Sequence, residues 1–201
     1  RSLRWENGLA QEPLLSMFCR SAGIDLPVDR PRLHLPDALA DLPARLGLPA
    51  RYAVFHCLSN DPSRDWRTDG FRSLAREVTE RMGLPVAEVG LLPVLAGVPG
   101  VINLCGEGGI MEMAAVIRGA KLFVGINSGP SHMANALGVP SVFILGNYHT
   151  ITDFMPYSGD AAACPHRHLV FACGPASGLT EEAVFAAVDD ALSGRDMQRE
   201  A

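Results

Sequence analysis

The sequence predicts an α/β protein built on a Rossmann-like parallel sheet with helices on both faces. From residue 51 onward, short apolar runs alternate with amphipathic stretches of helical period. The apolar runs are rich in Val, Ile, Leu and Phe, which is typical of strands covered on both sides. Apolar residues make up 48% of the 201 residues, so the chain can form a sizeable core. Together these observations favour a parallel sheet between two helical layers.

Periodicity and capping residues place the individual elements. The strands are expected at 52–57, 85–90, 101–104, 121–126, 140–145 and 168–172. The helices are expected at 69–82, 109–120, 131–138 and 180–192. Asp69 and Thr180 are the expected N-caps of the first and last of these helices, because such side chains accept hydrogen bonds from first-turn amides. Ligands of such sheets bind beyond the carboxyl ends of the strands.

Residues 1–49 differ in composition from the rest of the chain. Residues 14–22 carry apolar side chains at helical spacing, and Gly23 after them is the expected C-cap. The following stretch is rich in proline, which fixes φ and removes amide donors, so it holds at most a short helix at 37–46. We therefore expect 1–49 to be the end of a preceding domain plus a linker, and 50–201 to be the Rossmann-like domain.

Charge, hydropathy and cysteine content limit the classes of partner and location. The net charge is −5 and no cluster of basic residues is present, which argues against binding nucleic acid. No apolar run approaches the about 18 residues that a membrane-spanning helix needs. The five cysteines are scattered, which favours free thiols in a reducing compartment. A cytoplasmic location is expected.

One group of residues near the C-terminus has metal-binding side chains. Cys164, His166, His168 and Cys173 lie close together in the sequence. Their spacing matches no standard zinc site. A loop followed by a strand is the simpler interpretation, and no metal is expected.

The stretch GINSGPSHMANALGVPS, residues 125–141, leaves a strand through a tight turn and enters a helix. Ser128 is the expected N-cap, and Pro130 is tolerated in a first helical turn. Gly129 is expected to permit a backbone conformation that other residues resist. The amides near Ser128, Gly129 and Ser131 should point outward, and the helix dipole strengthens the anion site that they form.

Side chains of the same turn add hydrogen-bond donors. The hydroxyls of Ser128 and Ser131 and the imidazole of His132 surround the expected anion site, so a phosphate or diphosphate is the natural ligand. The alternative is an ordinary turn in which these polar residues only cap the helix. The combination of Ser, Gly, Pro, Ser and His at an edge where ligands bind favours the anion site.

Three stretches carry a resemblance to a known family. NSGPSHMANALGVP (127–140) resembles the D-[ST]-G-P-x-H-x-A-x-A-x-G-x-P signature of the ADP-heptose:lipopolysaccharide heptosyltransferases, glycosyltransferase family nine, at every fixed position but the first. SRDWRTDGFRSLA (63–75) resembles the family's K-x-W-P, with Arg64 in the lysine position. NLCGEGGIMEMAAVI (103–117) is similar to the family's N-L-x-G-x-x-x-L-x-E-x-A. The likeness extends over residues 51–192.

The resemblance implies the C-terminal, donor-binding half of a GT-B glycosyltransferase. It implies that Ser128, Gly129 and His132 hold the diphosphate of the donor. It also implies that Arg64 reaches the same phosphates, with a guanidinium fork in place of the lysine's point charge. No metal or cofactor is then expected, because His132 and Arg64 stabilise the leaving diphosphate.

Three further residues have expected roles. Glu88, near a strand end, is expected to bond a ribose hydroxyl. Asn127 replaces the signature's aspartate beside the diphosphate and keeps its size but not its charge. Trp66 either walls the nucleotide pocket or belongs to the core, and the core is the favoured interpretation.

The implied reaction moves a sugar, a heptose, from a nucleoside diphosphate to a hydroxyl of a lipopolysaccharide-type or lipid-linked glycan. An ADP-sugar is the expected donor. Such a bacterial enzyme is expected in the cytoplasm, including the surface of the inner membrane. The family's proposed general base is an aspartate of its first domain, and no residue here matches that position, so no catalytic residue is assigned.

Two other functions stay open at this point. One is a nucleotide or nucleotide-sugar binding module without catalysis, which the absent base position and Asn127 favour. The other is a sugar-nucleotide epimerase on the same fold, although those enzymes usually place acidic residues where this chain has Pro130, Ser131 and His132. We also expect a separate N-terminal domain, or self-association, to cover the face of the cleft.

Overall fold

The computed structural model describes residues 14–25, 31–146, 167–171 and 174–193. Within these residues six strands form one sheet in which every neighbouring pair is parallel, in the order β3-β2-β1-β4-β5-β6. The strands are β1 (Ala53–His56), β2 (Val86–Glu88), β3 (Val101–Asn103), β4 (Leu122–Ile126), β5 (Ser141–Leu145) and β6 (Arg167–Phe171). This is the strand order of a Rossmann fold, so the predicted fold class is confirmed.

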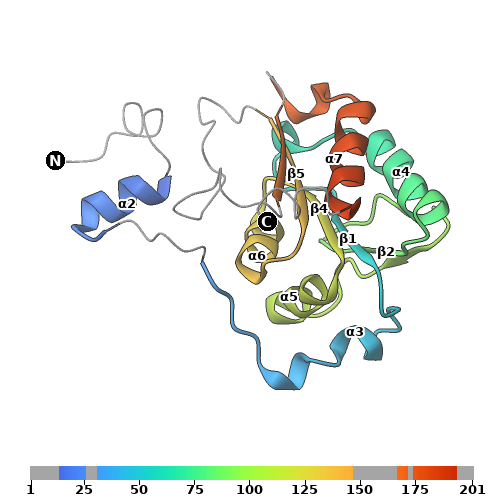
Figure 1. Ribbon diagram of the computed structural model, residues 1–201, viewed down its shortest axis with the longest axis horizontal. Helices are drawn as coiled ribbons and strands as arrows, with labels where there is room; N and C mark the ends of the chain where they lie inside the picture. The colour runs from blue at the N-terminus through green and yellow to red at the C-terminus, as the bar shows by residue number, and fades with distance from the viewer. Residues whose placement is uncertain (1–13, 26–30, 147–166, 172–173, 194–201) are drawn as a thin grey trace.

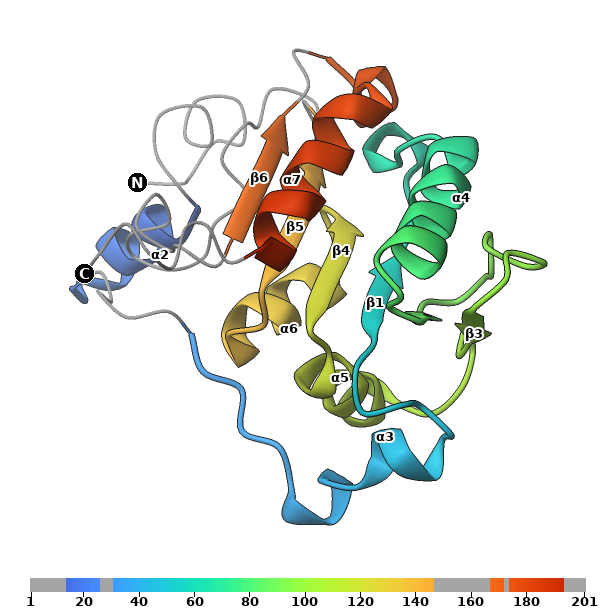
Figure 2. The same ribbon diagram turned by 45° about the vertical axis from the view of Figure 1, so that its right-hand side comes forward.

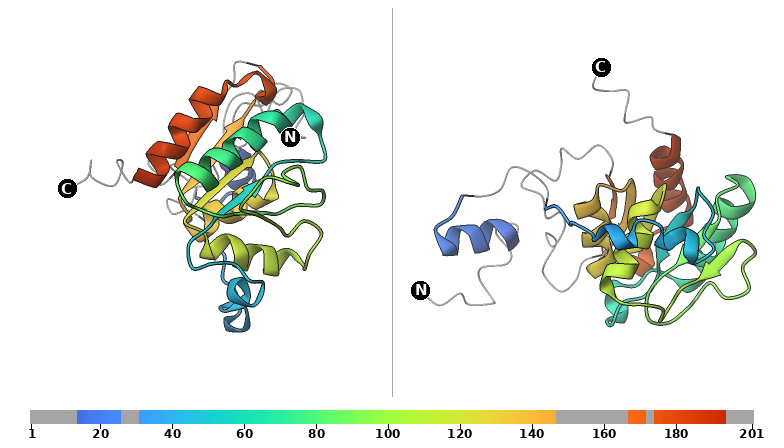
Figure 3. Two further views of the ribbon diagram at one scale, coloured as in Figure 1. Left: turned by 90° about the vertical axis from the view of Figure 1, so that its right-hand side faces the viewer. Right: turned by 90° about the horizontal axis from the view of Figure 1, so that it is seen from below.

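Helices cover both faces of the sheet (Figure 1). Helices α4 (Thr68–Arg76) and α7 (Glu181–Ser193) lie side by side on one face. Helices α5 (Ile110–Gly119) and α6 (Gly129–Leu137) lie on the other, with the short α3 (Leu42–Arg45) against α5. Figure 2 and the side view in Figure 3 show the two helical layers with the sheet between them. The chain therefore has the three-layer arrangement that its strand–helix alternation predicts.

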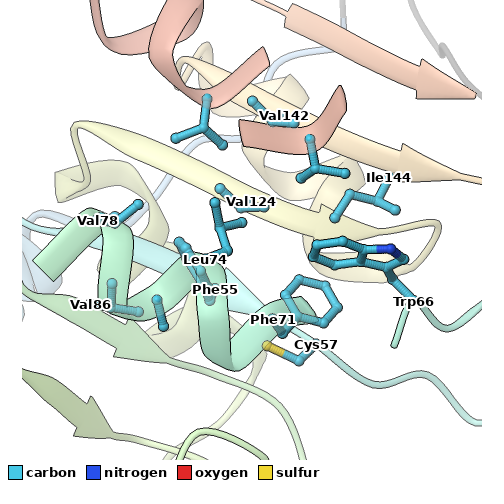
Figure 4. Close-up of a cluster of buried hydrophobic side chains, with 14 of the residues drawn as sticks. Phe55, Cys57, Trp66, Phe71, Leu74, Val78, Val86, Val124, Val142 and Ile144 are labelled. Carbon is cyan, nitrogen blue, oxygen red and sulfur yellow. The ribbon is translucent and has the colours of Figure 1, made fainter. Parts of the chain in front are cut away.

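A hydrophobic core fills the space between the sheet and each helical layer. Under α4 and α7, the strand residues Phe55, Val124 and Ile144 meet Phe71 and Leu74, all buried (Figure 4). On the opposite face, the second core cluster contains Val54, Ala87, Ile117, Phe123, Ala134 and Phe143. Because successive residues of β1 and β4 enter opposite cores, these strands must be apolar at every position, which explains the continuous apolar runs.

Trp66 belongs to the first core, as predicted. Its side chain is 2% exposed, and its ring meets that of Phe71 edge-on with centroids 5.1 Å apart. The indole Nε1 donates a hydrogen bond to the carbonyl oxygen of Leu179 at 2.9 Å. The loop after β1 is thereby fixed to the segment that precedes α7.

The capping of α4 differs from the prediction. The helix begins at Thr68, and the extended residue Arg67 occupies the N-cap position, so Asp69 is not the N-cap. The Asp69 carboxylate lies inside the first turn, where it accepts the Gly70 amide at 2.8 Å and pairs with Arg67 at 3.6 Å. Beyond Arg76 the helix continues as a π-helical segment, η3 (Glu77–Arg81).

The C-terminal helix has its predicted cap. The Thr180 hydroxyl accepts the amide of Ala183 at 3.3 Å, and α7 begins at the next residue, Glu181. The acidic residues Glu181 and Glu182 occupy its first turn, where the helix dipole favours negative charge.

The segment before residue 50 contains short helices. Helix α2 (Leu14–Ala22) ends before Gly23, whose φ of 69° fits the predicted C-cap. A single 3-10 turn, η1 (Asp37–Leu39), precedes α3. Leu48 is buried in the second core. The proposed division of the chain at residues 49 and 50 stays a prediction.

The described residues contain no helix that is both long enough and apolar enough to pass through a bilayer. Three of the four candidate metal ligands near the C-terminus, Cys164, His166 and Cys173, lie outside the described residues. The fourth, His168, lies in β6.

Candidate ligand site at the carboxyl edge of the sheet

The site lies where the direction of the chain's crossovers reverses. From β1 the chain crosses by way of α4 to β2, whereas from the neighbouring β4 it crosses by way of α6 to β5 on the other side. His56 ends β1 opposite Gly125 of β4, and Ser128 follows the end of β4. Loops that leave a parallel sheet in opposite directions open a crevice between them, and ligands of such folds bind there.

A pocket of about 830 Å³ occupies this crevice, a volume within the usual range for small-molecule sites. Its polar lining includes His56, Ser59, Asn60, Arg64, Glu107 and Ser128. Its apolar lining includes Leu42, Leu46, Leu91, Leu92, Ile110 and Met113. Three of these apolar side chains, Leu91, Leu92 and Ile110, are at least 66% exposed. The pocket therefore joins a polar group of residues around Ser128 to an open apolar rim.

The N-terminus of α6 supplies part of the polar lining. Ser128 occupies the N-cap position with extended backbone, and Pro130 lies in the first turn, as predicted. Helix α6 nevertheless begins at Gly129, two residues earlier than expected. Since Pro130 has no N–H and the amides of Ser131 and His132 donate to the carbonyl oxygen of Ser128, the amide of Gly129 is the one in the first turn without an intrahelical acceptor. With the helix dipole, this amide favours an anion.

Gly129 serves a different purpose from the predicted one. Its φ is outside the left-handed region, so the expectation of a special backbone conformation is wrong. A Cβ atom built on Gly129 would meet no other atom within 4 Å. Because Gly129 lines the pocket, the missing side chain leaves room for a ligand to approach the start of α6.

Ser131 is not part of the pocket lining. Its side chain is fully buried, and its hydroxyl donates to the carbonyl oxygen of Ile126 at 2.5 Å. Its amide donates to the carbonyl oxygen of Ser128 at 3.2 Å. Both polar groups therefore stabilise the strand–helix turn itself, and the expected contact of Ser131 with an anion is not one that this geometry supports.

Arg64 and the turn after β4 lie together, although 63 residues separate Arg64 from Asn127. Arg64 ends a short 3-10 turn, η2 (Pro62–Arg64), and its Nη1 donates to the backbone carbonyl oxygen of Asn127 at 3.2 Å. Its Nη2 donates to Oδ1 of Asn60. The guanidinium thus lies beside the N-terminus of α6 and lines the same pocket as Ser128. Asn127 contributes through its main chain to this contact.

Glu88 holds a loop in place. The carboxyl group is 1% exposed, and it accepts the amides of Val94 at 2.6 Å and Leu95 at 3.1 Å. Burial raises the pKa of this carboxyl, while the two amide bonds act to lower it. Glu88 is not among the pocket-lining residues, so its geometry does not support the expected contact with a ribose.

His132 lies in the first turn of α6 but is not a pocket-lining residue. Its side chain is partly buried, and burial lowers its pKa to about 4. The imidazole is therefore neutral at physiological pH, where it can donate a hydrogen bond but carries no charge.

His56 is a pocket residue that sequence reasoning missed. It is 7% exposed, its Nδ1 lies 3.0 Å from the hydroxyl oxygen of Ser128, and burial lowers its pKa to about 4. The available signal was a histidine that ends a buried strand. In a parallel sheet, such a residue lies at the same edge as the Ser128 turn.

A family model described as glycosyltransferase family 9 (heptosyltransferase) matches residues 14–169. No curated protein matches the sequence.

Three solved structures show the same fold. A glycosyltransferase family 9 protein from Veillonella parvula has a TM-score of 0.68 at 18% identity, with 82% of this chain and 54% of that one covered. The ADP-heptose lipopolysaccharide heptosyltransferase II of E. coli has a TM-score of 0.68 at 19% identity, with coverage of 88% and 57%. The E. coli heptosyltransferase WaaC with ADP has a TM-score of 0.60 at 20% identity, with coverage of 90% and 55%. The chain thus spans little more than half the length of each.

Proposed function

The chain belongs to glycosyltransferase family 9 (heptosyltransferase), and on that premise we propose that its pocket holds the nucleotide-sugar donor of a glycosyl transfer. The observation that carries this proposal is the meeting of Arg64 with the N-terminus of α6 at one pocket. Three features of this place suit a diphosphate. They are the guanidinium of Arg64, the amide at the start of α6, and the space that is open to a ligand because Gly129 has no side chain.

An ADP-sugar is the donor that we propose, with a heptose as the sugar. Support comes from the solved relatives, one of which is named for ADP-heptose and another of which contains ADP. The apolar part of the pocket, which includes Leu42, Leu46 and Met113, offers a surface for the flat face of a nucleobase. The acceptor that we propose is a hydroxyl group of a lipopolysaccharide-type glycan on the cytoplasmic side of the membrane.

In the proposed reaction, the bond between the anomeric carbon and the diphosphate oxygen breaks. The acceptor oxygen forms the new bond to that carbon and releases its proton to water, and the nucleoside diphosphate departs with the additional negative charge. Arg64 and the start of α6 stabilise this charge because they are already in place when it develops. In this scheme Arg64 supplies the positive charge that a metal ion supplies in other enzymes. No general base is assigned to this chain.

Calorimetric titration of the chain with ADP, UDP and GDP tests the proposal. We expect ADP to bind most tightly, and Arg64→Gln to weaken ADP by about ten-fold or more, since a hydrogen bond to a charged group is lost. The matched control is Arg81→Gln, which removes an exposed arginine on η3 whose partner is Glu77. Equal ADP affinity of Arg64→Gln and the wild type, or no binding of any nucleoside diphosphate, would overturn the proposal. Transfer of heptose from ADP-heptose to a glycan acceptor then tests the chemistry.

A further inference from the structure

Glu107 is a carboxylate in the pocket lining that the proposed donor site does not yet use. It is exposed, and it lies between Gly106 and Gly108 in the loop that joins β3 to α5. Among the residues that the structure describes, its carboxylate has no hydrogen-bonding or ion-pair partner. An ionised carboxylate only accepts hydrogen bonds, so the group of a ligand that it contacts must be a donor.

The backbone of this loop is held at the pocket by hydrogen bonds. The amide of Gly106 donates to the carbonyl oxygen of Gly90 at 2.8 Å, and the amide of Glu107 donates to that of Leu104 at 3.3 Å. The φ angles of Gly106 and Gly108 are 77° and 67°, in the left-handed region that favours glycine. A ligand that binds Glu107 therefore has to order one side chain and not the whole loop.

Two other carboxylates close to this loop are already engaged. Glu112 lines the pocket too, but its Oε2 accepts the amide of Gly109 at 3.1 Å, at the start of α5. Glu88, the expected ribose contact, accepts two amides of the loop after β2 and lies outside the pocket lining. Among the described residues of the pocket lining, Glu107 is therefore the one with a carboxylate open to a ligand.

The two ends of the pocket differ in charge. Arg64 and the start of α6 follow the neighbouring strands β1 and β4, whereas Glu107 and Glu112 follow β3. In the order β3-β2-β1-β4, the ends of β3 and β4 are three strand spacings apart, roughly 14 Å. Carboxylates repel an anion, so the diphosphate belongs at the α6 end. A ligand that fills both ends must carry an anion at one and hydrogen-bond donors at the other.

We propose that Glu107 accepts hydrogen bonds from a vicinal diol of the bound nucleotide sugar, in its ribose or in the sugar to be transferred, and thereby orients the donor in the pocket. This inference rests on the proposed function, because it assumes a diphosphate at the α6 end. The two oxygens of a carboxylate match two adjacent hydroxyl groups. Glu107 then takes the role that the sequence assigned to Glu88.

Titrations of the chain with ADP, 2′,3′-dideoxy-ADP and ADP-heptose test the inference. Glu107→Ala is expected to weaken by about ten-fold or more each ligand whose diol it contacts, because hydrogen bonds to a charged group are lost. A loss for ADP but not for dideoxy-ADP identifies the ribose diol. A loss for ADP-heptose with ADP unchanged identifies a diol of the transferred sugar. The matched control is Glu80→Ala, at an exposed carboxylate of η3 outside the pocket, which should change none of the affinities.

The direction of the change separates a contact from a mere effect of charge. If Glu107 met no hydroxyl group, its removal would only reduce the repulsion of the diphosphate, and all three ligands would bind as tightly as before or more tightly. That result, or an equal loss for all three, would overturn the inference and leave the donor site intact. Urea denaturation should give Glu107→Ala the stability of the wild type, since the side chain is exposed. A wild-type chain that binds none of the three would instead refute the proposed function, and the diol contact with it.

Discussion

Nη1 of Arg64 lies 3.2 Å from the backbone carbonyl oxygen of Asn127, which joins the loop after β1 to the turn after β4. Because the acceptor is a main-chain atom, the contact does not depend on which side chain occupies position 127. The backbone therefore fixes the position of the guanidinium, and a different side chain at position 127 can change the charge of the site without breaking this contact.

The variant Asn127→Asp, which restores the aspartate of the family signature, therefore tests the effect of side-chain charge on ligand binding. In Asn127→Asp the Arg64 contact remains, but a carboxylate is added close to the proposed diphosphate. We expect ADP affinity to fall by about three- to ten-fold at low salt and the loss to shrink as salt is added, since like charges repel and salt screens them. Titration at two ionic strengths measures this. An affinity that rises on substitution would show that the aspartate helps binding.

Alanine substitutions at Gly125 and Gly129, on either side of the turn after β4, should affect different properties: the first protein stability and the second ligand binding. Gly129→Ala adds a methyl group in open pocket space, so we expect unchanged stability and weakened ADP binding. Gly125→Ala would place its Cβ 2.7 Å from the ring of Phe123, so we expect a loss of about 1–3 kcal/mol in the free energy of unfolding. Urea denaturation and calorimetry of both variants separate the effects. A destabilised Gly129→Ala would contradict the assignment of that space to the ligand.

Glu88→Gln is expected to affect folding more than binding. The amides of Val94 and Leu95 lose a carboxylate acceptor, which should lower the free energy of unfolding by about 1–3 kcal/mol. The comparison variant is Glu107→Gln, at an exposed carboxylate in the pocket lining, which should leave stability unchanged. If Glu88→Gln kept its stability and lost ADP affinity, the ribose contact suggested by the sequence would be restored.

The buried imidazole of His56 makes stability depend on pH. Burial lowers its pKa from 6.5 to about 4, so between these values the unfolded chain takes up a proton that the folded chain does not. Stability is therefore unaffected above pH 6.5 and falls as the pH drops toward 4, by about 3 kcal/mol in all. His132 acts in the same direction, since burial also lowers its pKa.

Denaturation midpoints measured from neutral pH downward check this dependence. His56→Gln should reduce the slope of stability against pH. A slope in His56→Gln equal to that of the wild type would mean that the folded imidazole takes up its proton as readily as the unfolded one.

The sheet was predictable because its physical cause is local. Strands such as β1 and β4 are apolar at every position since both their faces are buried, and that pattern is visible in the sequence. The meeting of Arg64 with the Ser128 turn was also foreseen, but only by resemblance to the family signature. No periodicity in either segment indicates that they lie together.

The errors have a common origin in tertiary geometry. Because α6 begins at Gly129, Ser131 lies inside its first turn, with its hydroxyl directed back to the strand. The carboxylate of Glu88 is not available to a ribose because it accepts hydrogen bonds from two amides of the loop after Gly90. His56 was overlooked because its partner is 72 residues away, and only the pairing of β1 with β4 brings them together.

That pairing has a consequence for how the protein folds. Strand β1, which ends at His56, and strand β4, which ends two residues before Ser128, are neighbours in the sheet but remote in the chain, so closing this contact belongs among the slower, non-local events of folding. A partly folded chain that has formed only its local strand–helix units contains no assembled pocket. A nucleotide that binds here would therefore recognise only chains with a completed central sheet, and it would protect them from unfolding and proteolysis by mass action.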